Sequence, residues 1–473
     1  MKKLTLLGLS AMILGVAASA TACGAKTSKE ISLWVGNEEG VVSFYQQKCD
    51  EFLAANPSFP YKIKITGTDL GSIAGTILKD PSSCADIYSV AHDNVGKLAQ
   101  NGSASAITDP ELKAQVEADN SESFVRVSKS TVSDTEFLFA VPYISQALFL
   151  MYDTRYVSAE QAQSFETLQQ AAVAASASLG KDVKAVECPG TDGYNFSFTL
   201  LARNNETKAT SLKLYDDGTI FNGSTYVQGD DEVAFAKWIN GYFQDKNGFR
   251  FPTDAGWTLD IQNHNAISFI GGAWHRSAFA SAVGESNLGI AMLPTFTLTN
   301  KTAFGTATSG TTYRAGTFAD CKVMMINSKI ERAKYESAQQ IIKYLSSKDT
   351  QNEAFSKVGI VPSYSSFADS IDAIKAANPD ISQLVLDQAV AQTSMTEYSI
   401  PQPFVDARLN NFYYQMGAPA IYQALVEAND LTDRQVQEGL YKLQYIWQNG
   451  KAAEEVPADL PVADLCTYTR PAN

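Results

Sequence analysis

Apolar and polar positions along the chain follow two different periods. Some short runs are continuously apolar and rich in β-branched residues, as buried strands are, and other segments repeat apolar residues at helical spacing. Strands are predicted at 31–35, 61–65, 85–90, 265–271, 288–295 and 321–326. Helices are predicted at 41–55, 165–179, 332–345 and 432–447. Strands separated by segments of helix length are typical of βαβ units, so the pattern predicts an α/β fold with largely parallel sheets.

One stretch places polar side chains where a strand meets a helix. Residues 86–90 have the content of a buried strand, the polar turn His92–Asn94 follows, and residues 95–100 resume at helical spacing. In an open α/β sheet, ligands bind at such an edge because backbone N–H groups and short polar side chains point into a crevice there. The turn is therefore a candidate binding segment.

The length and charge of the chain narrow its class. A chain of 473 residues exceeds the about 100–200 residues of a usual domain, so two or more lobes are expected. With 45% hydrophobic residues, these lobes can be well packed. The net charge of −14 argues against a nucleic-acid partner, because such a partner requires a basic surface.

The N-terminus has the composition of an export signal. A basic start is followed by an apolar segment too short to span a membrane, and small residues end at Ala22, directly before Cys23. We expect residues 1–22 to be a signal peptide and residues 23–30 to be a lipid anchor and tether, with Cys23 acylated at the extracellular face of the cell membrane. The alternative is an ordinary signal peptide that happens to precede a cysteine.

The remaining cysteines show no metal-binding pattern. They stand at positions 49, 84, 188, 321 and 466. None belongs to a Cys-x-x-Cys or a Cys/His set at zinc spacing, so no metal is predicted, and nothing in the chain calls for a cofactor. Outside the cell, disulfides can form among them.

Several short segments carry a resemblance to a known family. They are Ala91–Asp93, Gly96, Leu98–Gln100, Gly102, Ile107–Thr108 and Ala147–Asp153. With these segments the chain resembles the carbohydrate-binding proteins of ABC importers, extracellular solute-binding proteins of the maltose and maltodextrin group. The resemblance implies a periplasmic-binding-protein-like fold, in which two α/β lobes are joined by multiple hinge crossings and the ligand cleft lies between them.

The resemblance also implies the boundaries of the lobes. We expect an N-terminal lobe of residues 31–141 and 295–357, a C-terminal lobe of residues 146–292 and 362–458, and a tail of residues 459–473. Pro142 cannot donate a backbone hydrogen bond, so the chain is expected to change direction there.

Sugars present hydroxyl groups around an apolar face, so their sites combine aromatic rings with carboxylates and amides. The resemblance implies that Asp93 holds sugar hydroxyls and that Trp274 and Tyr194 stack on sugar rings. Gln146 stands where the maltose group carries a glutamate.

Each of these residues has a second interpretation. Asp93 could cap the helix that follows it, and Trp274 could be a core aromatic residue. Gln146 could be a hydrogen-bonded hinge residue, and Phe196 could stack in place of Tyr194.

Other positions depart from the maltose group. Val90 replaces a tryptophan, and Glu39 replaces a ligand-binding lysine. A further tryptophan is missing after Pro401, and Phe404 or Arg408 could take its role, unless the loop suits another ligand. Maltodextrin specificity is therefore an open question. Further candidates, from their places near strand ends, are Asn94, Glu38 and Trp257.

A disulfide between Cys49 and Cys84 is also expected. Cys49 lies on the first predicted helix, and Cys84 opens the third predicted strand. In the fold that the resemblance implies, these two elements are neighbours.

The sequence favours a receptor over an enzyme. It contains no Gly-x-Ser-x-Gly or His-Glu-x-x-His motif, and its three histidines are scattered. We expect a lipid-anchored monomer that captures a sugar or oligosaccharide by hinge closure and delivers it to the permease of an ABC importer. The alternatives are a surface-anchored carbohydrate hydrolase, a surface scaffold, and the same receptor fold for a non-sugar solute.

Overall fold

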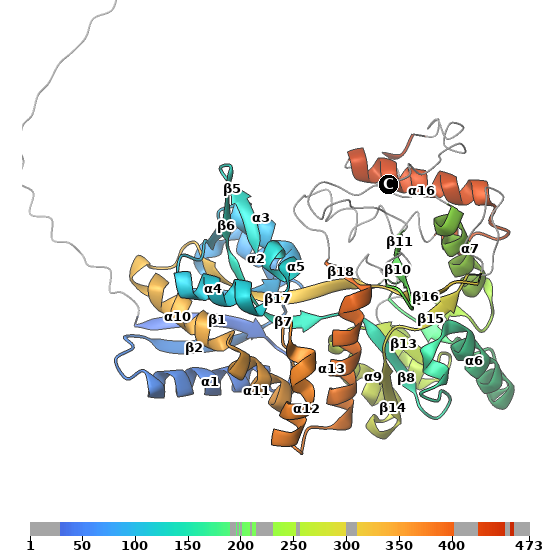
Figure 1. Cartoon of the computed structure of the whole chain (residues 1–473), viewed down its shortest axis with the longest axis horizontal. Helices are drawn as coiled ribbons and strands as arrows, with labels where there is room; N and C mark the ends of the chain where they lie inside the picture. Colours follow the sequence, from blue (N-terminus) through green and yellow to red (C-terminus); the bar gives the residue numbers. More distant parts are fainter. Residues whose placement is uncertain are drawn as a thin grey trace, which may run out of the picture.

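The computed structural model of the chain describes residues 29–189, 195, 198, 201–208, 211–213, 230–251, 256–298, 310–401, 424–449 and 455–457. They form two α/β lobes that lie side by side, and strands β7 (Ala140–Gln146) and β17 (Phe318–Asn327) run between them (Figure 1). In this part of the chain, no helix combines the length and the apolar character needed to cross a membrane. The predicted α/β class is confirmed, whereas the expectation of largely parallel sheets is wrong, since most strand pairs among the described residues are antiparallel.

A mixed sheet forms the first lobe. Its strand order is β18-β17-β3-β1-β2, and β4 and β7 also pair with β17. The further bounds are β1 Glu30–Gly36, β2 Lys62–Thr68, β3 Ile87–Ala91, β4 Ala104–Ser105 and β18 Ile400–Pro401. Strand β1 runs parallel to β2 and β3, whereas β17 is antiparallel to β3 and β7. The strands predicted in this lobe therefore form, within two or three residues of the predicted ends.

Alternating side chains of these strands build two separate cores, because successive residues of a strand point to opposite faces of a sheet. Met324 of β17 packs in the first core, and its neighbours Val323 and Met325 pack in the second. The first core receives α1 (Val41–Ala55), α4 (Pro110–Asp119), α10 (Tyr335–Leu345) and α11 (Lys348–Val358). The second core receives α2 (Ile73–Lys79), α3 (Val95–Gln100) and α5 (Glu122–Val127).

The two cores explain why the predicted disulfide between Cys49 and Cys84 is wrong. Both cysteines are free thiols. Cys49 is buried on α1 in the first core, whereas Cys84 packs against the second core, on the opposite face of the sheet. The elements are close in the fold, but their thiols point to different sides.

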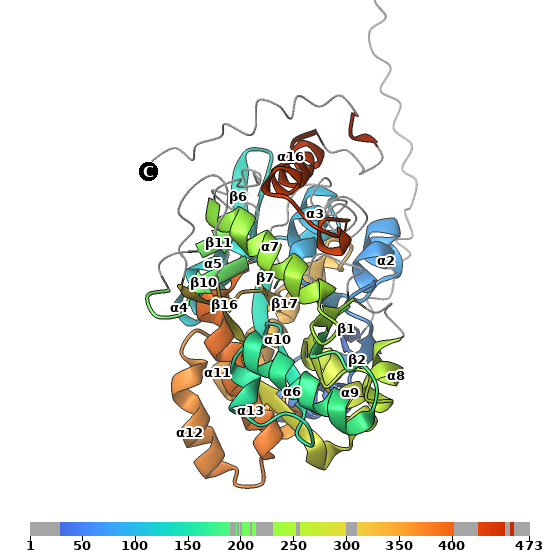
Figure 2. The same ribbon diagram turned by 90° about the vertical axis from the view of Figure 1, so that its right-hand side faces the viewer.

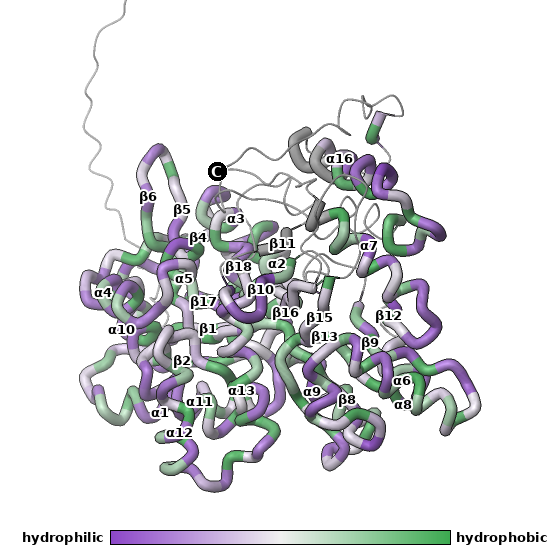
Figure 3. The backbone as a smooth tube through the Cα atoms, turned by 45° about the vertical axis from the view of Figure 1, so that its right-hand side comes forward, coloured by the Kyte–Doolittle hydropathy of each residue, from purple (hydrophilic) through white to green (hydrophobic). Residues whose placement is uncertain are grey.

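A hairpin stands clear of the first lobe (Figure 3). It consists of β5 (Lys129–Val132) and β6 (Thr135–Leu138), which pair with each other. Its two turn residues, Ser133 and Asp134, have φ angles of 49° and 61°, as a tight two-residue hairpin turn requires.

The second lobe contains two sheets, of order β12-β9-β13-β8-β14 and β11-β10-β16-β15. The strands of the first are β8 Phe149–Asp153, β9 Val186–Glu187, β12 Phe249–Arg250, β13 Ser268–Gly271 and β14 Leu288–Ala291. Those of the second are β10 Leu201–Asn204, β11 Ser211–Lys213, β15 Thr295–Thr297 and β16 Thr312–Ala315.

Helices pack on both faces of the second lobe's main sheet. On one face, α6 (Phe165–Leu179) and α7 (Asp230–Gln244) enclose a large aromatic core, on the side that faces the viewer in Figure 2. On the other face, α8 (Trp257–Gln262) and α9 (Arg276–Val283) cover a smaller core. Helix α16 (Asp433–Asn449) lies against α7, where Lys237 forms an ion pair with Asp433.

The chain returns to the first lobe later than expected. The predicted return was at residue 295, but β15 pairs with β16, which pairs with β10. Phe296 and Tyr313 are buried in the core of the second lobe. The strands at 295–297 and 312–315 therefore belong to the second lobe, and the return is made by β17.

Pro142 does not turn the chain, contrary to expectation. Strand β7 continues through it, and the ladder with β17 shifts its register between Lys322 and Val323. Such a bulge accommodates a residue that cannot donate to the ladder. The chain leaves the strand only after Gln146, and the segment near Val361 lies alongside, since the Ser145 N–H donates to the Val361 carbonyl at 2.9 Å. Helices α12 (Phe367–Ala377) and α13 (Gln383–Met395) follow, and α13 packs on β8 and β14.

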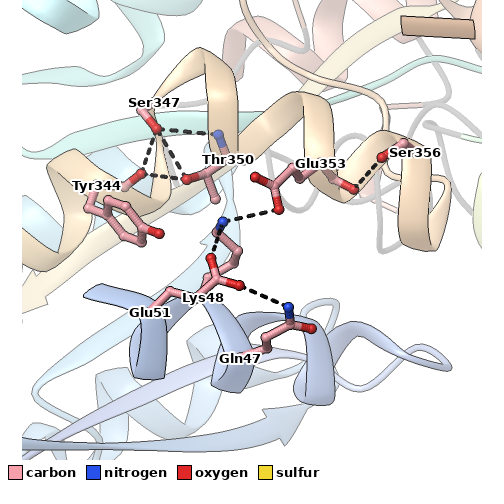
Figure 4. A network of polar contacts seen from close by, with 8 residues as sticks. All are labelled: Gln47, Lys48, Glu51, Tyr344, Ser347, Thr350, Glu353 and Ser356. Atoms are coloured by element: carbon pink, nitrogen blue, oxygen red, sulfur yellow. Dashed lines mark hydrogen bonds and ion pairs between the residues drawn. The ribbon is translucent and has the colours of Figure 1, made fainter. Parts of the chain in front are cut away.

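A buried lysine fastens α1 to α11 (Figure 4). The Lys48 ammonium donates to Glu51 Oε2 at 2.5 Å and to Glu353 Oε2 at 3.1 Å, and its side chain is only 5% exposed. Ser347 caps the start of α11 by accepting from the Thr350 N–H at 3.3 Å. The lysine stem is thus packed between the two helices while its charge is satisfied by both.

Lys48→Ala is expected to lower the free energy of unfolding by about 2 kcal/mol, because it removes charge-assisted hydrogen bonds and buried stem contacts. Urea unfolding measures the change. Lys343→Ala is the control, since Lys343 pairs with Glu111 at the surface, where ion pairs contribute about 0–1 kcal/mol. Equal losses in the two variants would contradict the role of Lys48.

Two glycines whose added Cβ would meet no neighbouring atom allow the effect of backbone strain on stability to be measured without a change in packing. Gly180, at the end of α6, has φ of 69°, and Gly75 lies within α2; a Cβ at either would meet no atom within 4 Å. Gly180→Ala is expected to cost about 1 kcal/mol because an L residue is strained at positive φ. Gly75→Ala is expected to stabilise by about 0.5–1 kcal/mol because alanine favours helix. Thermal unfolding should therefore shift in opposite directions, and shifts of the same sign would refute this account.

Candidate functional site

Polar side chains collect at one edge of the first lobe's sheet. Because β1, β2 and β3 are parallel, their carboxyl ends meet at this edge. Strand β1 leads to Glu38 and Glu39, β2 leads to Asp69, and β3 leads to the turn η2 (His92–Asn94). The sequence thus correctly placed its first-lobe candidates at a strand-end edge.

An edge of the second lobe's sheet meets the same region. Strand β13 ends at Gly271, which leads to Trp274, and Gly271 pairs with Phe149 at the start of β8. Gln146 ends β7 and lies only three positions before Phe149. Gln146 therefore lies where the sheet edge that carries Asp93 adjoins the sheet edge that carries Trp274.

Asp93 is a buried carboxylate of the turn. It is 7% exposed, and its Oδ1 accepts a hydrogen bond from Asn94 Nδ2 at 2.8 Å. Burial raises the pKa of Asp93, while the charges of Lys97, His92 and Lys322 oppose that rise. No side chain of the turn caps α3, so the interpretation of Asp93 as a helix cap is wrong.

Charged residues that the sequence analysis missed lie beside Asp93. Asp320 of β17 accepts from His92 Nδ1 at 2.6 Å and from the Lys322 ammonium at 2.8 Å. Asp320 and Lys322 interrupt a buried strand that is apolar up to its last residue, Asn327, and that interruption is the signal that could have identified them.

Gln146 has an unsatisfied acceptor. Its residue is 9% exposed, and its Oε1 is buried without a hydrogen-bond partner among the described residues. A buried acceptor without a donor costs free energy, so a ligand hydroxyl that donated to it would be favoured. The interpretation of Gln146 as a fully hydrogen-bonded hinge residue is therefore wrong for this oxygen.

Trp274 is exposed at the same edge. It lies on the short turn η5 (Ala273–His275) with 39% of its surface accessible, so it is not a core residue. A Cβ at Gly272 would come within 2.2 Å of its ring, so glycine allows the ring to lie against the backbone. Trp257, by contrast, is 4% exposed and stacks on Phe269 with centroids 4.1 Å apart, which places it in the core.

Glu38 and Glu39 are exposed after β1. The Glu38 carboxylate folds back over Gly36, where a Cβ would lie 2.0 Å from its Oε2. Burial is the main reason why the pKa of Tyr143 is raised, and the charge of Glu38 raises it further. Glu38 therefore lies on the side of β7, the strand that ends at Gln146.

Several sequence candidates fall outside the described residues. They are Tyr194, Phe196, Phe404, Arg408 and the lipidation residue Cys23. Within the described ranges, no group of three or more His, Cys, Asp or Glu side chains could hold a metal ion.

The second lobe has a buried carboxylate of its own, which the sequence analysis also missed. Glu187 of β9 accepts from Arg250 Nε at 2.8 Å, and Arg250 also pairs with Asp260. The second oxygen of Glu187 is buried without a partner in the part of the chain that the structure describes. Burial raises the pKa of Glu187 to about 7, although the Arg250 charge lowers it.

Known structures share this architecture. A maltodextrin-binding protein from L. casei, solved without ligand, is 18% identical, with 90% of this chain and 100% of that chain covered and a TM-score of 0.66. The maltose-binding periplasmic protein of Listeria monocytogenes, solved with maltose, is 17% identical, with 88% and 97% covered and a TM-score of 0.63. MalX from Streptococcus pneumoniae, solved with maltopentaose, is 16% identical, with 88% and 99% covered and a TM-score of 0.60. At such identities the likeness shows the fold alone.

Fold and topology together define a periplasmic-binding-protein-like α/β protein, as expected from the resemblance. The family model of bacterial extracellular solute-binding proteins matches residues 47–382, well over half of the chain. The protein belongs to this family, whose members are binding proteins. None of the curated proteins compared with the chain matches it.

Glu187 predicts a dependence of stability on pH. Its pKa in the folded state, about 7, lies above its ordinary value of 4.5, so folding favours the protonated form. The contribution of this group to the free energy of unfolding is therefore fully present below about pH 4.5 and is lost as pH rises to about 7, up to roughly 3 kcal/mol. Urea unfolding of the wild type and Glu187→Gln across this range measures it. A difference between the two proteins that does not change with pH would contradict the assignment.

Proposed function

We propose that this protein is a receptor that captures a sugar or oligosaccharide between its lobes and delivers it to the permease of an ABC importer. The observation that carries the proposal is that Asp93, Gln146 and Trp274 come from different strands and lobes yet belong to adjoining sheet edges. They combine a carboxylate, an unsatisfied amide oxygen and an exposed indole, the groups that sugar hydroxyls and sugar faces require.

Capture requires a difference in affinity between two arrangements of the lobes. A ligand that contacts both lobes stabilises the closed arrangement, and the crossings at Gln146, β17 and Val361 act as the hinges. A cleft that closes in this way excludes water from the hydroxyl contacts. The permease then recognises the closed form.

Starch-derived oligosaccharides are the first ligands to test. Similar structures were solved with maltose and maltopentaose, and two others were solved with acarbose. In this proposal, Tyr194 is the aromatic residue that stacks on the sugar together with Trp274. Phe404 takes the place of the missing tryptophan. Asn94, Glu38 and Glu39 line the first-lobe side.

We also propose where the protein is located. The family is extracellular, and the export signal that ends before Cys23 supports a lipid anchor on the outer face of the cell membrane. A monomer tethered by residues 23–30 stays near the permease. The proposal assigns no catalytic step, metal or cofactor to the protein.

The test is binding of a sugar panel by the chain expressed from Lys26. Thermal unfolding is followed with maltose, maltotetraose, maltopentaose, acarbose, other oligosaccharides and non-sugar solutes. A true ligand raises the midpoint by mass action, with about 2.7 kcal/mol of stabilisation at a hundredfold excess over Kd. Trp274→Ala and Asp93→Asn are each expected to weaken calorimetric binding at least about tenfold, or about 1.4 kcal/mol.

Phe137→Ala is the matched control, because Phe137 is 41% exposed on the β5–β6 hairpin, which stands clear of the first lobe (Figure 3). It should leave Kd unchanged. If only a non-sugar solute bound, the protein would still be a receptor, but its ligand would not be a sugar. Chromatography of the sugar after incubation decides the enzyme alternative, since hydrolysis products would replace the receptor with a hydrolase.

A further inference from the structure

Asp320 connects the two parts of the proposed ligand site. It lies on β17, where it is the register partner of Gln146 on β7, and its carboxylate also contacts His92 of the turn η2. Side chains of residues paired in an antiparallel ladder lie on the same face of the sheet. Asp320 is 4% exposed, so it sits beneath the turn rather than at the surface.

Both oxygens of Asp320 are used within the protein. His92 Nδ1 lies 2.6 Å from Oδ1, and because a carboxylate can only accept, that nitrogen carries the hydrogen. The Lys322 ammonium donates to Oδ2 at 2.8 Å. Burial alone would raise the pKa of Asp320, but Lys322 and His92 outweigh it and hold that pKa at about 2. Asp320 is thus ionised and has no need of a ligand hydroxyl.

Asp93 is in the opposite situation. Among the described residues, only Asn94 donates to it, and no cation forms an ion pair with it. The titratable groups that face it are Lys97 of α3, His92 of its own turn, and Asp320, Cys321 and Lys322 of β17, with Asp69 facing Lys322 in turn. Burial and the Asp320 charge raise the pKa of Asp93, whereas Lys97, His92 and Lys322 lower it.

Stability alone does not account for the pair on β17. A buried ion pair is often no more stabilising than apolar residues of the same size, and the rest of β17 is apolar except for its last residue, Asn327. The pair occurs where the strand passes the turn and Gln146, so its position points to the site.

We infer that Asp320, ion-paired with Lys322, is a positioning residue of the ligand site: through His92 it holds the turn that presents Asp93, and the pair sets the charge environment beneath that turn. This inference rests on the proposed function, in which the ionised Asp93 accepts hydrogen bonds from sugar hydroxyls. Asp320 itself does not touch the ligand.

Two substitutions on β17 test the inference because their electrostatic effects are opposite. Asp320→Asn removes a negative charge near Asp93, and Lys322→Met removes a positive one. The Asp93 carboxyl carbon is followed by NMR in the unliganded protein expressed from Lys26, with ¹³C-labelled aspartate and Asp93→Asn to assign the signal. We expect the titration midpoint of Asp93 to fall by about one pH unit in Asp320→Asn and to rise by about one pH unit in Lys322→Met.

Affinity for the sugar found in the panel is measured on the same proteins. Asp320→Ala, which also loses the contact with His92, is expected to weaken binding about tenfold, and Asp320→Asn, which can still accept from His92, by less. The pH below which the affinity falls should shift together with the titration midpoint of Asp93. It should be lower than in the wild type for Asp320→Asn and higher for Lys322→Met. A merely structural role would not produce opposite shifts.

Asp153→Asn is the matched control. Asp153 is 2% exposed and ion-paired with Arg155, but it lies at the end of β8 opposite to Phe149. It should leave both the Asp93 midpoint and the affinity unchanged. The inference would be overturned if the titration midpoint of Asp93 in Asp320→Asn and Lys322→Met matched that of the wild type. It would also be overturned if the affinity of Asp320→Ala for the sugar were within twofold of the wild-type affinity. If no solute binds but the midpoints move in opposite directions, the proposed function fails while the coupling of Asp320 to Asp93 stands.

Discussion

Strand β17 is the constraint on which the rest of the structure depends. It pairs with β3, β4, β7 and β18, and nine of its ten residues are buried. Its alternating side chains divide the first lobe into two cores. It also brings the chain back from the second lobe, and the charges of Asp320 and Lys322 lie in its first half, next to that crossing.

The candidate site follows from strand direction. Parallel strands bring their carboxyl ends to one edge, where the turns present backbone groups and short polar side chains. In each lobe the polar or exposed residues begin directly after a buried strand, as His92 follows β3 and Trp274 follows β13. Gln146 links the edges because β7 of one sheet continues almost directly into β8 of the other. The buried carboxylates of both lobes are accompanied by cations, as Lys322 accompanies Asp320 and Arg250 accompanies Glu187.

Local patterns predicted elements well and their partners less well. The helices at 41–55 and 165–179 have the predicted bounds, since amphipathic spacing and the glycine at 180 are local signals. The strand at 295 was recognised as part of an apolar run but assigned to the wrong lobe, because an apolar strand fits either core. Cys49 and Cys84 were assigned to neighbouring elements, but spacing does not reveal which face of a sheet a thiol occupies.

The sequence by itself determined the α/β class, the export signal as an expectation, and the strand-end positions of Asp93, Gln146 and Trp274, because each is a local pattern or a matched segment. Only the tertiary structure decided that Asp320 lies under the Asp93 turn, 228 positions away from His92 in the chain. It also decided that Trp257 is core and Trp274 exposed. The reason is physical: burial, ion pairing and an unsatisfied acceptor arise from contacts between distant segments, and those contacts exist only once the sheets have formed.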